Sequence, residues 1–163
     1  MSFEKLNLDV KLFAGVKSAG YTTPTPIQLK AIPPIMTGRD VVGLAQTGTG
    51  KTAAFVLPIL HRLLAGANGP VRALIIAPTR ELSEQTHKVI GQFARKTKLK
   101  SASIYGGVSI QGQIKQLCNQ VDIVSGCPGR LLDHIERGTL DLSKIEVLVL
   151  DEADHMFDMG FLP

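Results

Sequence analysis

The stretch Ala45-Gln46-Thr47-Gly48-Thr49-Gly50-Lys51-Thr52 decides the fold that this sequence predicts. It follows the apolar residues 41–45 and precedes the helix-like residues 53–64, so we expect a strand, a glycine-rich turn and a helix in succession. Glycines allow backbone N–H groups to approach an oxyanion closely, and the N-terminus of a helix points its unpaired N–H groups at the same place. We therefore predict that residues 45–52 form a phosphate-binding loop.

Two side chains at the end of this loop add what a nucleoside triphosphate requires. Lys51 supplies a positive charge for the β- and γ-phosphates, and the hydroxyl of Thr52 is placed to bind Mg²⁺. The general pattern G-x-x-x-x-G-K-[ST] begins with glycine, whereas this chain has Ala45, which restricts only the entry to the turn. The alternative is an ordinary connection that happens to contain a lysine. The expected strand and helix on either side argue against it.

The composition is that of one ordinary globular domain. The 163 residues are 44% hydrophobic and 20% charged, which allows a real core and excludes a disordered chain. No run approaches the about 18 apolar residues of a membrane span, and the N-terminus lacks the layout of a signal peptide. Cys118 and Cys127 show neither metal-ligand spacing nor a disulfide framework, so we expect a cytoplasmic location. The net charge of +4 permits a nucleic-acid partner without implying one.

Apolar segments typical of strands alternate along the chain with amphipathic segments typical of helices. Beyond residues 41–45, strands are expected at residues 71–77, 101–105, 121–125 and 145–150, and helices at residues 3–19, 26–31, 53–64, 79–97, 110–117 and 129–136. Gly20 and Gly138 suit helix ends, and Thr25 with Pro26 suits a helix start. The alternation predicts a single α/β domain with a doubly wound, mostly parallel sheet covered on both faces. Ligands of such sheets bind at the carboxyl ends of the strands.

An acidic stretch, Asp151-Glu152-Ala153-Asp154, follows the expected buried strand at residues 145–150 directly. Asp151 at such a strand end can hold Mg²⁺, directly or through water, and Glu152 can orient or deprotonate an attacking water. Acidic runs are common on surfaces, so this stretch alone would be a weak signal. Combined with Gly50-Lys51-Thr52 on another strand end, it predicts a site for a nucleoside triphosphate and Mg²⁺.

With these motifs in place, the sequence resembles the first RecA-like domain of a DEAD-box RNA helicase over essentially its whole length. Asp151-Glu152-Ala153-Asp154 matches the box itself, and residues 3–28 match the Q motif. The resemblance implies that Tyr21 stacks on adenine and that Gln28 hydrogen-bonds its edge, so that the nucleotide is ATP. An amide can pair with the N6 donor and the N7 acceptor of adenine. The alternative for Gln28 is a residue on the surface of a helix.

The resemblance implies a complete set of ATP-site residues. The nucleotide-binding residues are Phe3, Tyr21, Pro26 and Gln28, followed by the loop residues Ala45, Gln46, Thr47, Gly48, Thr49, Gly50, Lys51 and Thr52. The catalytic residues are Lys51, Asp151 and Glu152, the Mg²⁺ ligands are Thr52 and Asp151 (partly through water), and Asp154 serves in coupling hydrolysis to RNA.

Three further motifs match segments that bind RNA in the family: Pro78-Thr79-Arg80, Gly106-Gly107, and Cys127-Pro128-Gly129-Arg130. Arginines supply charge, and glycines and helix N-termini supply N–H donors, for contacts to phosphates and sugars. Binding through such contacts is independent of sequence and sensitive to salt. Cys127 stands where the family usually has threonine, and a thiol is a weaker hydrogen-bonding group. Alternatively, Arg80 and Arg130 are structural and pair with Glu81 or Asp133.

The resemblance also implies that the chain is incomplete. It contains neither a Ser-Ala-Thr segment nor a His-Arg-x-Gly-Arg segment, and we expect a second RecA-like domain to be missing from it. We expect the parent protein to be a monomeric ATP-dependent RNA helicase without a membrane segment. This chain alone should bind ATP, and RNA weakly, without efficient turnover. The alternatives are a nucleotide- and RNA-binding module without helicase activity, and a P-loop kinase or DNA-directed helicase.

Overall fold

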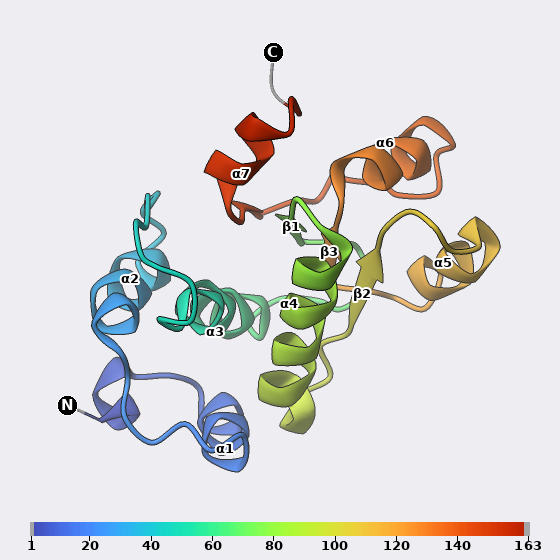
Figure 1. Ribbon diagram of the computed structural model, residues 1–163. Coiled ribbons are helices and arrows are strands. Elements are labelled where there is room, and N and C mark those ends of the chain that lie inside the picture. The colour runs from blue at the N-terminus through green and yellow to red at the C-terminus, as the bar shows by residue number, and fades with distance from the viewer. Residues whose placement is uncertain (1, 162–163) are drawn as a thin grey trace. The chain divides into compact units, whose positions relative to one another are not determined.

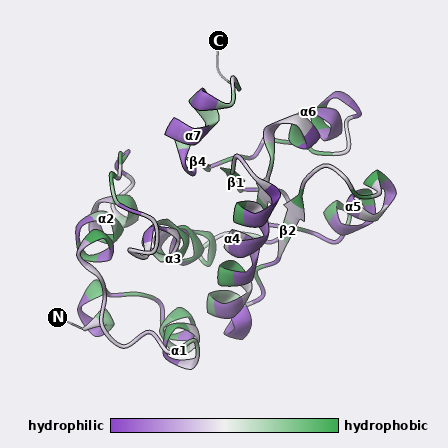
Figure 2. Ribbon diagram, in the orientation of Figure 1, coloured by the Kyte–Doolittle hydropathy of each residue, from purple (hydrophilic) through white to green (hydrophobic). Residues whose placement is uncertain are grey.

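The computed structural model describes residues 2–161, and their contacts divide the chain into two compact units. The first unit contains the described residues up to Ala67 together with Val89–Leu99, and it is helical (Figure 1). The second contains Asn68–Lys88 and the described residues from Lys100 onward, and it holds all the strands of the described chain. The helix α4 (Arg80–Phe93) contributes residues to both units, and its ribbon carries both hydrophobic and hydrophilic turns (Figure 2).

The first unit is built from short helices whose ends are set by local signals. They are the 3₁₀ helices η1 (Phe3–Leu6) and η2 (Ala94–Lys96) and the α-helices α1 (Val10–Ser18), α2 (Pro26–Met36) and α3 (Lys51–Leu63). The prediction of one helix over residues 3–19 is wrong, because Asn7 adopts a left-handed conformation with φ 52°. Asp9 then caps α1 by accepting a hydrogen bond from the N–H of Lys11 at 2.8 Å. Gly20 ends the segment with φ 82°, as expected.

The helix α2 is longer than the sequence indicates. It was expected to end at residue 31, before Pro33 and Pro34, but both prolines lie inside it. Each proline removes one N–H donor from the helix. The helix nevertheless continues to Met36, and Gly38, with φ 80°, follows its end.

The strand expected at residues 41–45 is absent. These residues form no strand in the described part of the chain, and the side chains of Val42 and Leu44 are 91% and 92% exposed. A strand exists only when a neighbouring strand satisfies its N–H and C=O groups. Residues 41–45 carry the apolar pattern of a strand, but no partner strand pairs with them among residues 2–161.

The second unit contains a four-stranded parallel sheet in the order β2-β3-β1-β4. The strands are β1 (Ala73–Ile76), β2 (Ser101–Ile104), β3 (Ile123–Gly126) and β4 (Val147–Leu150). In the register, Ala73 lies between Ile123 and Val147. The helices of this unit are the first part of α4 with α5 (Ile110–Leu117), α6 (Pro128–Glu136) and α7 (Ala153–Asp158). The α/β class and the parallel sheet are confirmed.

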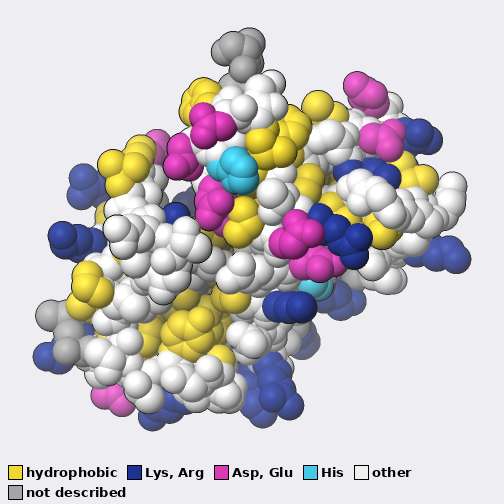
Figure 3. All heavy atoms as spheres, viewed as in Figure 1, with side chains coloured by type: hydrophobic (Ala, Val, Ile, Leu, Met, Phe, Trp, Pro, Cys, Tyr) yellow, Lys and Arg dark blue, Asp and Glu magenta, His cyan; other side chains and the backbone are white. Residues whose placement is uncertain are grey.

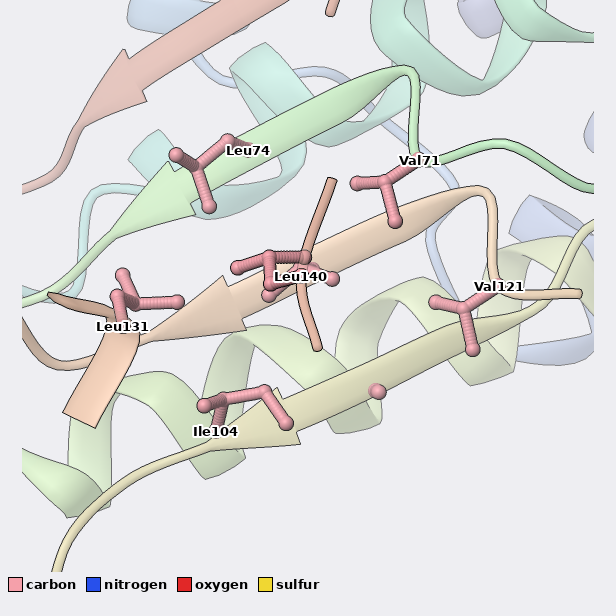
Figure 4. Packing of buried hydrophobic residues seen from close by; sticks show 8 residues of the cluster. Val71, Leu74, Ile104, Val121, Leu131 and Leu140 are labelled. Atoms are coloured by element: carbon pink, nitrogen blue, oxygen red, sulfur yellow. The ribbon is translucent and has the colours of Figure 1, made fainter. Parts of the chain in front are cut away.

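One face of this sheet carries a hydrophobic cluster (Figure 4). Its members come from three strands and from the segments beside them: Val71, Leu74, Ala102, Ile104, Val121, Val124, Leu131 and Leu140. The strand β4 differs from the prediction of a buried strand, because Leu148 and Leu150 are exposed. It pairs with β1 on one edge, and the described chain supplies no strand for its other edge.

Candidate functional site

The expected phosphate loop forms a turn that leads into a helix. The hydroxyl of Thr49 donates to the carbonyl oxygen of Gln46 at 2.6 Å, which closes the turn. Gly48 and Gly50 both adopt left-handed conformations, with φ 81° and 89°. Lys51 is the first residue of α3. The N–H groups of the first turn of this helix have no helical partner, so the loop fits an anion such as a phosphate.

Gln28 ties α2 to this loop. Its Oε1 accepts a hydrogen bond from the N–H of Thr25 at 2.9 Å, and its Nε2 donates to the carbonyl oxygen of Gly50 at 3.2 Å. Because Gln28 is 1% exposed, the alternative of a surface residue is wrong. The amide retains a second N–H and a second lone pair for another partner. A Cβ atom on Gly50 would lie 2.5 Å from Nε2 of Gln28, so that amide would have to shift, and the φ of 89° itself favours glycine.

The aromatic side chains of the Q motif pack against one another in the first unit. The ring of Tyr21 lies edge-on to Phe93, with centroids 5.1 Å apart, and to Phe3, with centroids 6.3 Å apart. Pro26 is the first residue of α2, as expected. Phe3 therefore supports Tyr21, and stacking of Tyr21 on adenine stays a prediction.

The acidic stretch follows β4 in the second unit. Asp151 is buried, and its N–H donates to the carbonyl oxygen of Ile76 at 2.9 Å. Glu152 occupies the N-cap position of α7 in a left-handed conformation with φ 51°, and one of its side-chain oxygens lies 3.7 Å from Nδ1 of His155. Strained backbone of this kind concentrates at functional sites. Asp154 is exposed in the first turn of α7, over which Figure 3 shows acidic side chains beside a histidine. Lys51 belongs to the first unit and Asp151 to the second.

Arg80 begins α4 and contacts two neighbours in the second unit. Its Nε and Nη2 each lie 3.5 Å from Oε1 of Glu84, one helical turn later. Its guanidinium carbon lies 4.6 Å from the centre of the Tyr105 ring. The hydroxyl of Tyr105 donates to the same Oε1 at 2.5 Å. This hydrogen bond lowers the pKa of Glu84 and raises the pKa of Tyr105. The alternative partner Glu81 is wrong, because the carboxylate beside Arg80 is that of Glu84.

The Arg130 guanidinium is held by hydrogen bonds to neighbouring residues of the chain. Its Nη1 donates to the carbonyl oxygen of Val108 at 3.0 Å and to Oε1 of Gln113 at 2.9 Å. Its Nε lies 3.8 Å from Asp133, so the structural pairing with this residue is present. The arginine side chain is only 16% exposed. These bonds join α6 to the loop that follows β2 and to α5.

Gln113 of α5, which is 3% exposed, bonds both to the segment that follows β2 and to α6. Its Nε2 donates to the carbonyl oxygen of Tyr105 at 2.9 Å, so its Oε1 faces Arg130 and Nε2 of His134, which is 3.1 Å away. Oε1 can only accept, and therefore Nε2 of His134 carries a proton. Nδ1 of His134 lies 2.8 Å from the hydroxyl of Thr139. Burial, with a smaller effect of Arg130, lowers the pKa of His134, which favours the neutral ring.

The remaining predicted RNA residues lie at turns and helix starts of the second unit. Gly107 adopts a left-handed conformation with φ 79°, and both Gly106 and Gly107 are exposed. The hydroxyl of Thr79 accepts from the N–H of Leu82 at 3.3 Å, beside Pro78. Cys127 precedes α6, which begins with Pro128 and Gly129, and burial raises the pKa of its thiol.

Residues 2–161 contain neither a cluster of metal-ligating side chains nor a membrane-spanning helix. No group of three or more histidine, cysteine, aspartate or glutamate side chains is arranged to hold a metal ion. No helix in the described part is long and apolar enough to cross a membrane.

Comparison with known proteins identifies the family. The sequence profile described as DEAD/DEAH box helicase matches residues 25–163. The chain belongs to this family. It is 50% identical over 162 residues to the DEAD-box ATP-dependent RNA helicase CshA of Streptococcus pneumoniae, and 46% identical over 161 residues to the ATP-dependent RNA helicase DeaD of Mycobacterium tuberculosis. These alignments cover 99% and 98% of the chain, but 31% and 28% of the relatives. The chain thus spans about a third of the length of these curated relatives.

A solved structure of the family shares the fold. The crystal structure of a DEAD box protein from the hyperthermophile Methanococcus jannaschii matches with a TM-score of 0.92 and 42% identity. The match covers 99% of this chain and 44% of that protein. The RecA-like fold expected for this DEAD-box family member is confirmed.

Reading the sequence missed four residues that surround the arginines of this DEAD-box chain: Glu84, Tyr105, Gln113 and His134. The sequence does contain a signal for Glu84, because it lies four residues after Arg80 on one helix and has the opposite charge. The positions of Tyr105 and Gln113 depend on how β2 and α5 meet Arg80 and Arg130, and no local pattern signals them.

Proposed function

We propose that this chain is the ATP-binding part of an ATP-dependent RNA helicase. The observation that carries the proposal is the turn at residues 46–50, with Gly48 and Gly50 in left-handed conformations and Lys51 at the start of α3. It fits a phosphate by its N–H donors and by its charge. Membership of the DEAD/DEAH box helicase family supports both ATP and RNA as ligands, as do the names of the relatives.

In this proposal the first unit holds the nucleotide. Tyr21 and Gln28 contact adenine, with Phe3 and Pro26 supporting them, and residues 45–52 surround the phosphates. Because Gln28 bonds the carbonyl oxygen of Gly50, adenine on Gln28 and phosphates on the loop are held by one connected structure. Lys51 offsets the charge of the phosphates.

The second unit supplies the carboxylates. Thr52 and Asp151 suit the hydroxyl and carboxylate ligands that Mg²⁺ takes, with water completing the set. Mg²⁺, when bound, would neutralise charge on the phosphate oxygens. Glu152 orients the attacking water and accepts its proton at the side-chain carboxylate. Asp154 couples this site to RNA.

RNA binds through its backbone in the same proposal. The contacting residues are Pro78, Thr79, Arg80, Gly106, Gly107, Cys127, Pro128, Gly129 and Arg130. Exposed glycines and the start of α6 offer N–H donors to phosphates. Since no base is read, affinity should be independent of RNA sequence and fall with salt.

The test measures ATP binding and ATP hydrolysis, with and without RNA, in the 163-residue chain and in a version extended to the length of the relatives. We expect RNA-stimulated hydrolysis in the extended version. The resemblance implies that arginines of the second RecA-like domain complete the site for phosphoryl transfer, and this sequence contains no His-Arg-x-Gly-Arg segment. Loss of such an arginine costs about 10³–10⁵ in rate, so we expect negligible hydrolysis by the 163-residue chain alone. Lys51→Ala should abolish ATP binding in both, whereas Lys30→Ala on the exposed side of α2 should not. Unchanged affinity in Lys51→Ala, or hydrolysis insensitive to RNA, would refute the proposal.

A further inference from the structure

Three side chains of the second unit form a single interacting group around Arg80. Oε1 of Glu84 receives the Tyr105 hydroxyl at 2.5 Å and lies 3.5 Å from both Nε and Nη2 of Arg80. The guanidinium carbon of Arg80 lies over the Tyr105 ring, 4.6 Å from the ring centroid. Figure 3 shows acidic and basic side chains next to each other over the first turns of α4. We call this arrangement the arginine seat: Arg80, Glu84 and Tyr105.

The seat leaves part of Arg80 available. The side chain is 50% exposed, and its Nη1 has no partner within the described residues. The Nε–Nη2 edge faces the carboxylate and the guanidinium carbon lies over the ring, so Nη1 is the nitrogen left for another acceptor. A phosphate accepts hydrogen bonds in the plane of a guanidinium, and the contacts with Glu84 and Tyr105 restrict how this group can turn.

We propose that Tyr105 is a positioning residue for Arg80, whose open edge it aims at an RNA backbone phosphate. This inference rests on the proposed RNA-binding function of Arg80. An unrestrained arginine loses rotamer freedom when it binds a phosphate, whereas a seated arginine has already lost part of it. Tyr105 therefore raises affinity through Arg80 without contacting RNA. The Tyr105 hydroxyl has a second effect, because it holds the Glu84 carboxylate on the Nε–Nη2 edge and away from Nη1.

The seat itself can be measured without RNA. We would compare the order of the Arg80 Nε–H bond, by ¹⁵N relaxation of the full chain, with that of the exposed Arg95. In the wild type, Arg80 should be the more ordered of the two. Tyr105→Leu removes the ring and should bring Arg80 to the mobility of Arg95, while Tyr105→Phe keeps the ring and should retain most of the order. Equal order in the wild type and in Tyr105→Leu would overturn the seat.

The effect on RNA is tested with a labelled single-stranded oligouridylate in the full chain and in the extended version. A cation over an aromatic ring at an exposed site corresponds to about a two- to fivefold change in affinity. Tyr105→Leu should weaken binding by this factor, and Tyr105→Phe should stay within about twofold of the wild type. In an Arg80→Ala background, Tyr105→Leu should have no further effect.

The same double-mutant cycle separates the competing explanations. A loss of the same size in the Arg80→Ala background would mean that Tyr105 contacts RNA itself or acts on the fold, and it would overturn the proposal. Arg80→Ala should also reduce the slope of log affinity against log salt by about one. If the wild type binds no RNA at all, the proposed function fails, while the relaxation measurement still decides whether the seat exists.

Discussion

Replacing Gln113 by leucine tests the network that joins β2, α5 and α6. The amide of Gln113 donates to the carbonyl oxygen of Tyr105 and accepts from Arg130 and His134, at distances of 2.9–3.1 Å. Leucine has a similar size but can make none of these bonds. Three polar groups would therefore lose a partner in a region where Gln113 itself is 3% exposed.

The magnitude follows from the environment of each group. A buried polar group left without a partner costs about 1–3 kcal/mol. His134 is fully buried and carries its proton on the nitrogen that faces Gln113, so it should bear most of the cost. Arg130 keeps its bond to Val108 and some contact with solvent, so its share should be small. Burying the leucine side chain offsets about 1 kcal/mol. We expect a net loss of about 2–4 kcal/mol in the free energy of unfolding.

Urea unfolding followed by far-ultraviolet circular dichroism measures this loss. An unchanged slope of the free energy of unfolding against urea concentration shows that only stability has changed. Gln116→Leu, at an exposed position of the same helix, is the matched control and should stay within about 0.5 kcal/mol of the wild type. Gln113→Glu keeps the acceptor for Arg130 and His134 but faces the Tyr105 carbonyl oxygen with a second acceptor, so it should fall between the two. A Gln113→Leu protein as stable as Gln116→Leu would refute the network.

Two further predictions concern the loop and the histidines His87 and His134. Gly50→Ala should destabilise the chain by about 1–3 kcal/mol in the same urea assay and weaken ATP binding. The reason is that φ is 89° and that the new Cβ would lie 2.5 Å from Nε2 of Gln28. Wild-type affinity for ATP would contradict this prediction. The free energy of unfolding should fall as the pH drops below about 6.5, since burial lowers the pKa of both His134 and His87 in the folded chain and the unfolded chain then binds more protons. His134→Gln, which can still donate to Gln113, should make this decline shallower between pH 7 and 5.5, and an unchanged slope would argue against a neutral His134.

Local backbone requirements account for the boundaries that the sequence predicts well. Gly20 and Gly138 follow helix ends in left-handed conformations, and Pro26 begins α2. Each of these residues acts through its own φ angle or its missing N–H, so its effect depends little on the rest of the chain. Asn7 adopts the same conformation as the glycines and was not recognised, because asparagine permits it without requiring it.

Pairing between distant segments accounts for what the sequence does not predict. Residues 41–45 have the apolar pattern of a buried strand, yet Val42 and Leu44 are almost fully exposed. The pattern indicates that these apolar side chains are fit for burial, whereas formation of a strand also needs a hydrogen-bonded neighbour. The strand β4 does form, because it pairs with β1, yet Leu148 and Leu150 are exposed, since burial of a side chain also needs another element to cover it.

Arg130 shows how far a motif can specify a site. The motif predicts an arginine that grips RNA, but the orientation of its guanidinium is set by the Val108 carbonyl oxygen and by Gln113, 22 and 17 residues away. Hydrogen bonding to these groups uses Nη1, while the positive charge is unchanged. The structural bonds and the proposed RNA role are therefore compatible if Arg130 acts on phosphates mainly through its charge. The N–H donors would then come from Gly129 and the start of α6, where the backbone is exposed.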